Sequence, residues 1–281
     1  MTPATPADAP AITAFLQAHA ATSMFPLSNL LRDGMGGDAP RAMRFWLAGD
    51  PPTGLLGVTQ DGMVLPQMPA LPQGLDRAHA ILRDIPVMGL IGAAPQVAAL
   101  RGLPGLADAP TLLDEVEPLF TLALADLIAP DCTGCRLIPL DQAPCDLLIA
   151  WRAQAAVESL GQPQDTAQSR AAAEIAAWIA ADTHRVLLRD GVPVAMTGFN
   201  AQVPGAVQVG AVFTPPPLRG QGHARRAVAL HLEEARTRGV TRASLFAAND
   251  QAARAYRAIG FRQIGQMTLT LFAGPQQVRH G

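Results

Sequence analysis

A short glycine-bearing segment, Arg219-Gly-Gln-Gly-His-Ala224, carries the most specific chemical signal in the chain. It follows an apolar stretch from Ala206 to Phe213 and a proline-rich connector, and it opens a long run with helical spacing. A strand, a glycine turn and a helix in this order direct free backbone N–H groups and the positive end of a helix dipole at one point. The segment therefore predicts a binding site for a pyrophosphate group.

A second pattern follows in Asn249-Asp-Gln-Ala-Ala-Arg-Ala-Tyr-Arg-Ala-Ile-Gly-Phe261. Asn249 is suited to cap a short helix that continues through Ala258 and ends at Gly260. This helix also presents Tyr256, the only tyrosine in the chain. The two patterns lie on successive strand–helix units, so the structure can bring them together.

Together these patterns resemble the GNAT acyltransferase superfamily. Residues Arg219–Ala224 match its coenzyme A loop, Arg/Gln-x-x-Gly-x-Gly/Ala, and Asn249–Phe261 match its closing signature, Asn-x-x-Ala-x-x-x-Tyr-x-x-x-Gly-Phe. The clear resemblance covers about Leu137 to Phe272, and the first half resembles the superfamily only in outline. The resemblance implies that acetyl-CoA, or another short acyl-CoA, is the cosubstrate and that no metal is needed. It further implies direct transfer to a small-molecule or peptide amine in a ternary complex.

The resemblance also assigns residues to the acyl-CoA. Small residues at Gly222 and Ala224 let the backbone approach phosphate oxygens closely, and a splayed strand before the loop accommodates the pantetheine arm. Asn249 bonds the pantetheine, caps the helix, or does both. The cofactor-binding residues implied are Val212, Phe213, Thr214, Arg219, Gly220, Gln221, Gly222, His223, Ala224, Arg225 and Asn249.

Tyr256 occupies the position at which the superfamily often has a general acid. A phenol hydroxyl held near the thioester sulfur can protonate the thiolate that leaves when an amine attacks the carbonyl. The alternative is that the ring of Tyr256 packs against the sheet with its hydroxyl at the surface.

The sequence does not identify the general base of the reaction. Many relatives carry a glutamate on the strand before the loop, where this sequence has Gln208 and no carboxylate. Glu158 and His184 are further candidates for substrate contact or base, although each is also an ordinary surface residue in type. An amine can also lose its proton to water. The competing interpretation is a non-catalytic coenzyme A-binding sensor or interaction module that keeps the fold.

The elements of the second half follow from periodicity and turn residues. Asp146–Ser159 and Thr166–Ala181 predict helices, and Asp190-Gly191 predicts a hairpin between two strands within 185–200. Ala206–Phe213 predicts a third strand. The remaining predicted elements are a helix over Gly222–Arg238, a strand over Val240–Ala247, a helix over Asn249–Ala258 and a closing strand over Gln266–Phe272. This order favours an α/β (α+β) mixed sheet flanked by helices, and the hairpin excludes a dinucleotide-binding βαβ unit.

The first half shows a weaker copy of this plan. Ala11–Ala21 and Leu27–Arg32 predict helices, and Ala42–Gly49, Gly54–Gln60, Val87–Gly92 and Leu119–Leu127 predict strands. Only the segment Pro72–Arg77 stands where a glycine turn is expected, and its match is weak. We therefore predict two tandem GNAT-like domains, a degenerate one over 1–130 and an acyl-CoA-binding catalytic one over 131–281.

Composition excludes several other classes. The 281 residues carry a formal charge of -2, which gives no electrostatic reason to expect nucleic acid. No apolar run approaches the roughly 20 residues of a membrane span. The N-terminus lacks the basic start and the apolar core that are typical of a signal peptide, so we do not expect one. We expect a cytoplasmic protein, and its lysine-free, alanine-rich composition is typical of a GC-rich bacterial genome.

The cysteines give a weaker signal. Cys132 and Cys135 have the spacing of a metal or redox pair, and Cys145 lies nearby. A structural zinc site needs four ligands, and the sequence offers no second pair beside them. We interpret this segment as a turn with reduced thiols.

Overall fold

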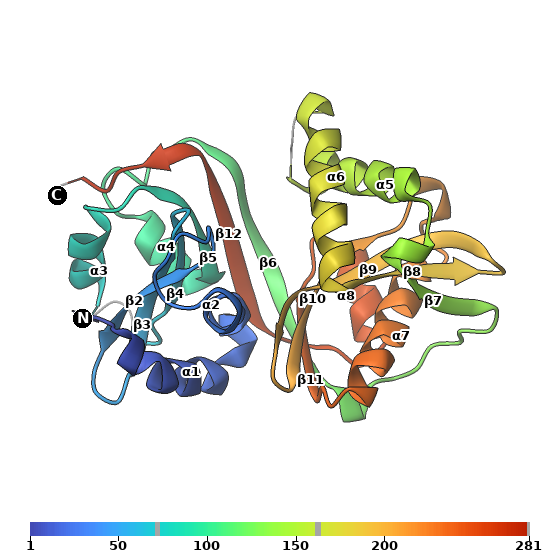
Figure 1. Cartoon of the computed structure of the whole chain (residues 1–281), viewed down its shortest axis with the longest axis horizontal. Coiled ribbons are helices and arrows are strands. Elements are labelled where there is room, and N and C mark those ends of the chain that lie inside the picture. The colour runs from blue at the N-terminus through green and yellow to red at the C-terminus, as the bar shows by residue number, and fades with distance from the viewer. Residues whose placement is uncertain (71–73, 161–163, 280–281) are drawn as a thin grey trace. The chain divides into compact units, whose positions relative to one another are not determined.

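The computed structural model describes residues 1–70, 74–160 and 164–279. The chain forms two compact units, Met1–Glu117 with Gly265–Gly281 and Pro118–Ile264. Each is a mixed sheet with helices packed on it, which confirms the predicted α/β class (Figure 1). None of the described helices is long and apolar enough to cross a membrane.

The first unit has the strand order β1-β2-β3-β4-β5-β12. β4 and β5 pair in parallel, and the other described neighbours in this order are antiparallel. Leu56, Val58 and Leu90 from its strands meet Val97 and Leu100 from the helix after β5 in a buried core. The elements are β1 Thr2–Pro3, α1 Ala9–Ala18, α2 Ala20–Asp33, β2 Met43–Ala48, β3 Gly54–Thr59, β4 Met63–Gln67, α3 Leu75–Leu82, β5 Val87–Ala93 and α4 Ala94–Arg101.

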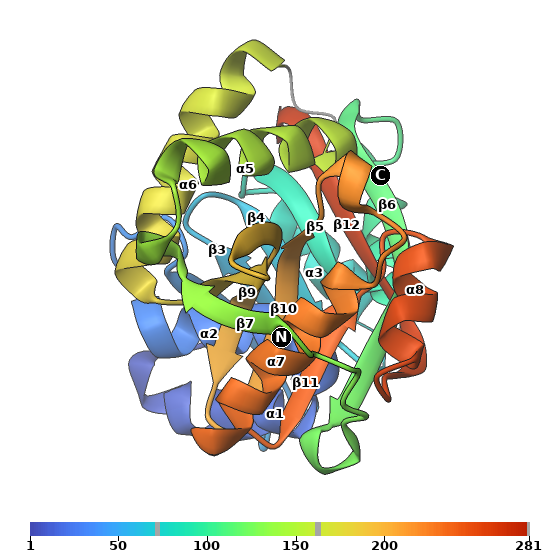
Figure 2. The ribbon, with the colours of Figure 1, turned by 90° about the vertical axis from the view of Figure 1, so that its right-hand side faces the viewer.

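The second unit has the order β6-β11-β10-β9-β8-β7, in which β10 and β11 are parallel and the other described neighbours are antiparallel. Helices α5 and α6 cover one face of this sheet, and α7 covers the other (Figures 1 and 2). The elements are β6 Thr111–Ala123, β7 Cys135–Pro139, α5 Cys145–Leu160, α6 Gln164–Ala181, β8 His184–Arg189, β9 Val192–Val203, β10 Ala206–Phe213, α7 His223–Thr237, β11 Arg242–Phe246 and α8 Asp250–Arg257. The chain then continues into β12, Arg262–Gln276, which pairs with β5 of the first unit.

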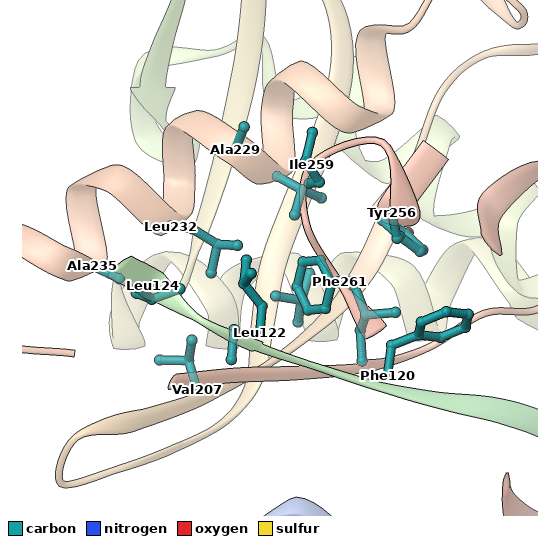
Figure 3. Packing of buried hydrophobic residues seen from close by; sticks show 14 of the residues in the cluster. Phe120, Leu122, Leu124, Val207, Ala229, Leu232, Ala235, Tyr256, Ile259 and Phe261 are labelled. Atoms are coloured by element: carbon teal, nitrogen blue, oxygen red, sulfur yellow. The ribbon is translucent and has the colours of Figure 1, made fainter. Parts of the chain in front are cut away.

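The core beneath α7 and α8 is built by alternation along the strands. Val207 and Val209 on β10 point to the same side as Leu245 on β11, and residues between them point to the other side. Leu232 on α7 and Ile259 after α8 close this core (Figure 3). A fully buried leucine or isoleucine contributes about 1.5–3 kcal/mol by leaving water, so this packing fixes the strands that carry the candidate site.

The structure corrects the expected role of two strands. The predicted last strand of the first half is β6, and its residues Leu119–Ala123 pair with β11 of the second unit. The predicted closing strand of the second half is β12, and its residues Met267–Leu271 pair with β5 of the first unit. Each half thus lends a strand to the other sheet, and the compact units cut across the expected division at residue 130.

Other elements differ from expectation in extent. The helix expected over 27–32 begins at Ala20, although Pro26 lies inside it. Tertiary packing stabilises it, because Met24, Leu27 and Leu30 are buried. The sequence did not predict β4, α3 or β7. The weak turn expected over 72–77 falls partly outside the described residues.

Candidate functional site

Strands β10 and β11 stop pairing before β10 ends, and this point is called the fork below. Their parallel register ends with Val209 opposite Leu245, whereas β10 continues to Phe213. The pairing of β10 with β9 is irregular beyond Gly210, and Ala211 has a φ of 50°. Such a bulge bends a strand away from its neighbour. Within the described residues, β10 beyond the fork has no partner strand on that side, so an extended ligand can bond to its backbone.

Three predicted pantetheine-binding residues lie at this end of β10. Val212 packs against the core beneath α7, and Phe213 packs against Trp151 of α5 with ring centroids 6.1 Å apart. The hydroxyl of Thr214 is buried and has no hydrogen-bond partner among the described residues. The strand end is therefore held from both faces and still offers a polar group.

Residues 219–224, called the glycine loop below, connect β10 to α7. Gly220 has a φ of 78°, and Gly222 has a φ of 75° at the N-cap of α7. Glycine adopts this left-handed backbone without strain. Among the described residues, no hydrogen bond uses an amide N–H of residues 220–225, a stretch that contains Gln221, His223 and Ala224. The dipole of a 15-residue helix lies behind them, and free amides in this position are suited to an anion.

Two side chains add unpaired polar atoms to the glycine loop. Arg225 Nε and His223 Nδ1 are buried, and neither has a hydrogen-bond partner in the described part of the chain. Gly222 makes room for Arg225, because a Cβ at position 222 would lie 3.0 Å from Arg225 Nε. Burial lowers the pKa of His223, and the nearby Arg226 and Arg189 lower it further, so its ring is neutral at pH 7. These unpaired polar atoms fit the oxygens of a pyrophosphate.

Arg219 brings Glu158 to the glycine loop. Its Nε donates to the Thr214 carbonyl at 2.9 Å, and its Nη2 donates to Glu158 Oε2 at 2.5 Å. Its guanidinium also lies over the ring of Phe213. Glu158, which also accepts from Gln154, is thus paired with a loop arginine. This pairing favours a role in holding the loop over one as general base.

Arg226 is a functional candidate that sequence reasoning missed. Its Nη1 donates to the Gln221 carbonyl at 2.6 Å, and its Nε donates to the Asp131 carbonyl at 2.7 Å. It therefore ties the glycine loop to the segment before β7. Only its place one turn into α7 could have indicated this, because its partners are backbone atoms without a sequence signal.

The closing signature forms α8 and its cap. Asn249 Oδ1 accepts from the Ala252 amide at 2.9 Å, so Asn249 does cap the helix. Tyr256 is buried, and its ring meets Phe261 edge to face with centroids 6.1 Å apart (Figure 3). The same cluster contains Val209 and Leu245, the last paired residues before the fork. The ring of Tyr256 therefore packs in the core beneath α7 and α8.

His184 is held by packing. Its ring stacks on Trp178 at a centroid distance of 3.8 Å, its Nδ1 is bonded to the Thr183 hydroxyl, and it lies against Gly198. Burial, together with the nearby charges of Arg152 and Arg185, lowers its pKa to about 3. Such an imidazole is neutral and weakly basic, which does not favour it as the general base.

Gln208 lies on β10 just before the fork. It is buried, its Nε2 donates to the Val209 carbonyl at 2.8 Å, and Ser244 of β11 lies directly opposite. The structure therefore separates the three candidate substrate residues. Gln208 is beside the fork, His184 is in a packed stack, and Glu158 is at the glycine loop.

The remaining sequence signals add no site. Within the described ranges, no group of three or more His, Cys, Asp or Glu side chains could hold a metal ion. Cys132 and Cys135 are free thiols joined by a turn in which the Cys135 amide donates to the Cys132 carbonyl. Burial and the neighbouring Cys135 raise the pKa of the Cys132 thiol, which lowers its reactivity at pH 7.

Comparison with known proteins agrees with this geometry. Residues 151–261 match the model of the Acetyltransferase (GNAT) family. Over 72 residues, 26% of this chain, the sequence is 40% identical to the acetyltransferase Atu2258 of Agrobacterium fabrum. The aligned part spans about half, 51%, of that relative's length.

Solved structures share the fold along nearly the whole chain. A GCN5-related N-acetyltransferase from Sphaerobacter thermophilus is 19% identical, with a TM-score of 0.56 over 100% of this chain and 96% of its own. One from Kribbella flavida is 20% identical, with a TM-score of 0.55 over 92% and 95%. A tandem GNAT protein from the clavulanic acid biosynthesis pathway is 16% identical, with a TM-score of 0.52 over 98% of each chain.

The family match contains the fork, the glycine loop and Tyr256, which are the features on which the sequence resemblance rested. Acetyltransferases of this family use acetyl-CoA and act on small-molecule or peptide acceptors. Residues 151–261 are therefore similar to the GNAT acetyltransferase family.

Proposed function

We propose that this protein transfers an acetyl or short acyl group from acyl-CoA directly to an amine. The observation that carries the proposal is the junction of the fork with the glycine loop. There a strand edge suited to an extended arm leads straight into unused amides and the unpaired Arg225 Nε. A pantetheine arm joined to a pyrophosphate has this order of groups.

The proposed chemistry needs few residues. The amides of residues 220–225 and the side chain of Arg225 hold the pyrophosphate. Arg219 also pairs with the pyrophosphate, either in place of Glu158 or together with it. The amine nitrogen attacks the thioester carbonyl, a C–N bond forms and the C–S bond breaks. The proton lost by the nitrogen balances the one gained by the sulfur, and Tyr256 supplies the latter as general acid. Asn249 keeps α8, and with it Tyr256, in place.

We further propose that the first unit binds no acyl-CoA. There β4 and β5 pair in parallel only at Met63 and Val64, which leaves a fork like that in the second unit. The amide of Met68, just beyond β4, already donates to Gln96 Oε1 at 2.8 Å. The N-cap of α4 is Ala93, and Leu100 stands seven residues later, where the second unit has Asn249 and Tyr256.

Two measurements test the proposal. Calorimetric titration with acetyl-CoA should show one site per chain. Thiol release in the presence of a panel of amines should depend on the amine. Binding without transfer to any amine would instead support a coenzyme A sensor. Two equivalent sites per chain would contradict the assignment of the first unit.

A further inference from the structure

Three neutral side chains form a row across the second sheet just before the fork. Gln208 of β10 lies opposite Ser244 of β11, and Ser244 lies opposite Thr121 of β6. Their chain neighbours point into the core beneath α7 and α8, so these three side chains point to the opposite face. We call this set the polar row.

Two atoms of the polar row have no hydrogen-bond partner within the described residues. Gln208 is 2% exposed and Ser244 is 3% exposed, and the unpartnered atoms are Gln208 Oε1 and Ser244 Oγ. A buried polar atom without a partner is costly. Adjacent strands lie about 4.8 Å apart, so one small polar group can reach both atoms.

The orientation of the Gln208 carboxamide shows which kind of group this is. Its Nε2 donates to the Val209 carbonyl, so the end that remains is the oxygen, which can only accept. Thr121 donates to the Ala243 carbonyl and is therefore satisfied. A group with two N–H hydrogens would satisfy both Gln208 Oε1 and Ser244 Oγ.

The charge of the polar row limits the protonation state of that group. Its three members are neutral, and His184 on the same face is neutral as well, since its pKa is about 3. Glu117 lies on the same face of β6 as Thr121, two alternations away, and burial and the neighbouring Glu115 raise the pKa of its carboxyl group, which disfavours a full counter-charge there. A buried ammonium without a counter-charge is strongly disfavoured. At pH 7 an amine with a pKa near 10 is neutral in only about one molecule in a thousand, whereas a weakly basic amine is already neutral.

We propose that Gln208 and Ser244 bind the nitrogen of the acceptor as a neutral amine, and that the physiological acceptor is a weakly basic amine such as an aromatic amine or a hydrazide. The proposal rests on the proposed acyl transfer. The amine donates its two N–H hydrogens to Gln208 Oε1 and Ser244 Oγ. Its nitrogen lone pair is then free to attack a thioester at the fork. The proton balance agrees, because a neutral amine needs no carboxylate to remove a proton before attack.

The test changes the charge of the polar row without changing its shape. Wild-type protein is assayed at pH 7 with an aromatic amine and with a primary alkyl amine, and kcat/KM is compared. We expect the aromatic amine to be preferred. In Gln208→Glu a carboxylate can pair with an ammonium and take its proton, so the ratio of kcat/KM should shift at least tenfold toward the alkyl amine.

Gln202→Glu is the matched control, because it adds the same charge at an exposed position on β9 and should leave the ratio unchanged. Acetyl-CoA affinity is measured in each variant as evidence of folding. If Gln208→Glu does not fold, Gln208→Leu and Ser244→Ala replace it. Each should raise KM for the amine about tenfold and leave acetyl-CoA affinity intact.

An unchanged ratio in folded Gln208→Glu, or an unchanged amine KM in both replacements, overturns the proposal. So does a wild-type preference for the alkyl amine. If the wild type binds acetyl-CoA but acylates no amine, the proposed function itself fails, and this outcome is distinct from the others.

Discussion

At the residue scale, Tyr256 joins a packed ring to a reactive hydroxyl. Its ring is buried against Phe261 in the core beneath α7 and α8. Tyr256→Phe keeps the ring and removes only the hydroxyl, so we expect kcat to fall about 100-fold, the low end for loss of a general acid. Acetyl-CoA affinity and thermal midpoint should change little. Unchanged turnover at saturating acetyl-CoA would remove Tyr256 from the mechanism.

A second residue-scale prediction concerns two buried histidines of the second unit. Burial lowers the pKa of His184 to about 3 and that of His231 to about 2, and His231 stacks on Phe199. In the unfolded chain both titrate near 6.5. Below that pH the unfolded chain binds protons that the folded chain does not. The stability that these two neutral histidines contribute is therefore present above about pH 6.5 and is lost as pH falls toward 3.

The size of this effect can be measured by denaturant unfolding. We expect a loss of about 2 kcal/mol per histidine between pH 6.5 and pH 5. His231→Phe keeps a stacked ring and removes the titration, so its free energy of unfolding should fall less over that range. An equal fall in both proteins would show that the titration of His231 does not contribute to the acid sensitivity.

At the scale of elements, the glycine loop depends on one backbone conformation. Gly222 caps α7 with a φ of 75°, and a Cβ there would press on Arg225. Gly222→Ala should cost about 1 kcal/mol of stability and weaken acetyl-CoA binding at least tenfold, as calorimetry would show. Gly239→Ala at the other end of α7 is the control. It has a φ of 88° and open space around a Cβ, so it should lose stability only.

Local elements were predictable where a residue type has one strong local meaning. The hairpin at Asp190-Gly191, the glycine loop and the Asn249 cap all follow from turn or cap chemistry within a few residues. The partners of β6 and β12 did not follow, because alternation shows which face of a strand is buried and not which sheet it joins. Arg226 and Ser244 were missed for a similar reason, since their roles arise from register and backbone carbonyls distant in sequence.

At the scale of the whole molecule, the strand exchange predicts which fragment can fold. The core of the second unit includes the buried side chains of Phe120 and Leu122 on β6 and of Leu124 just after β6. A chain of residues 131–281 lacks them and loses about 5–9 kcal/mol of apolar burial, comparable to the whole stability of a domain. We expect it to show no cooperative thermal unfolding by circular dichroism.

Extending the same fragment to begin at residue 111 restores β6 beside β11. This longer chain should unfold cooperatively and bind acetyl-CoA. If the chain of residues 131–281 folds and binds equally well, β6 is dispensable and the division at residue 130 describes the domains better than the compact units do.

The central claim is that the second unit passes an acyl group from acyl-CoA directly to an amine. A rapid-quench experiment with acetyl-labelled acetyl-CoA, followed by mass spectrometry of amine and protein, tests it most directly. The account predicts label on the amine only when amine is present, with none on the protein at any time. Label that appears first on the protein, or bound acetyl-CoA that never labels an amine, would contradict it.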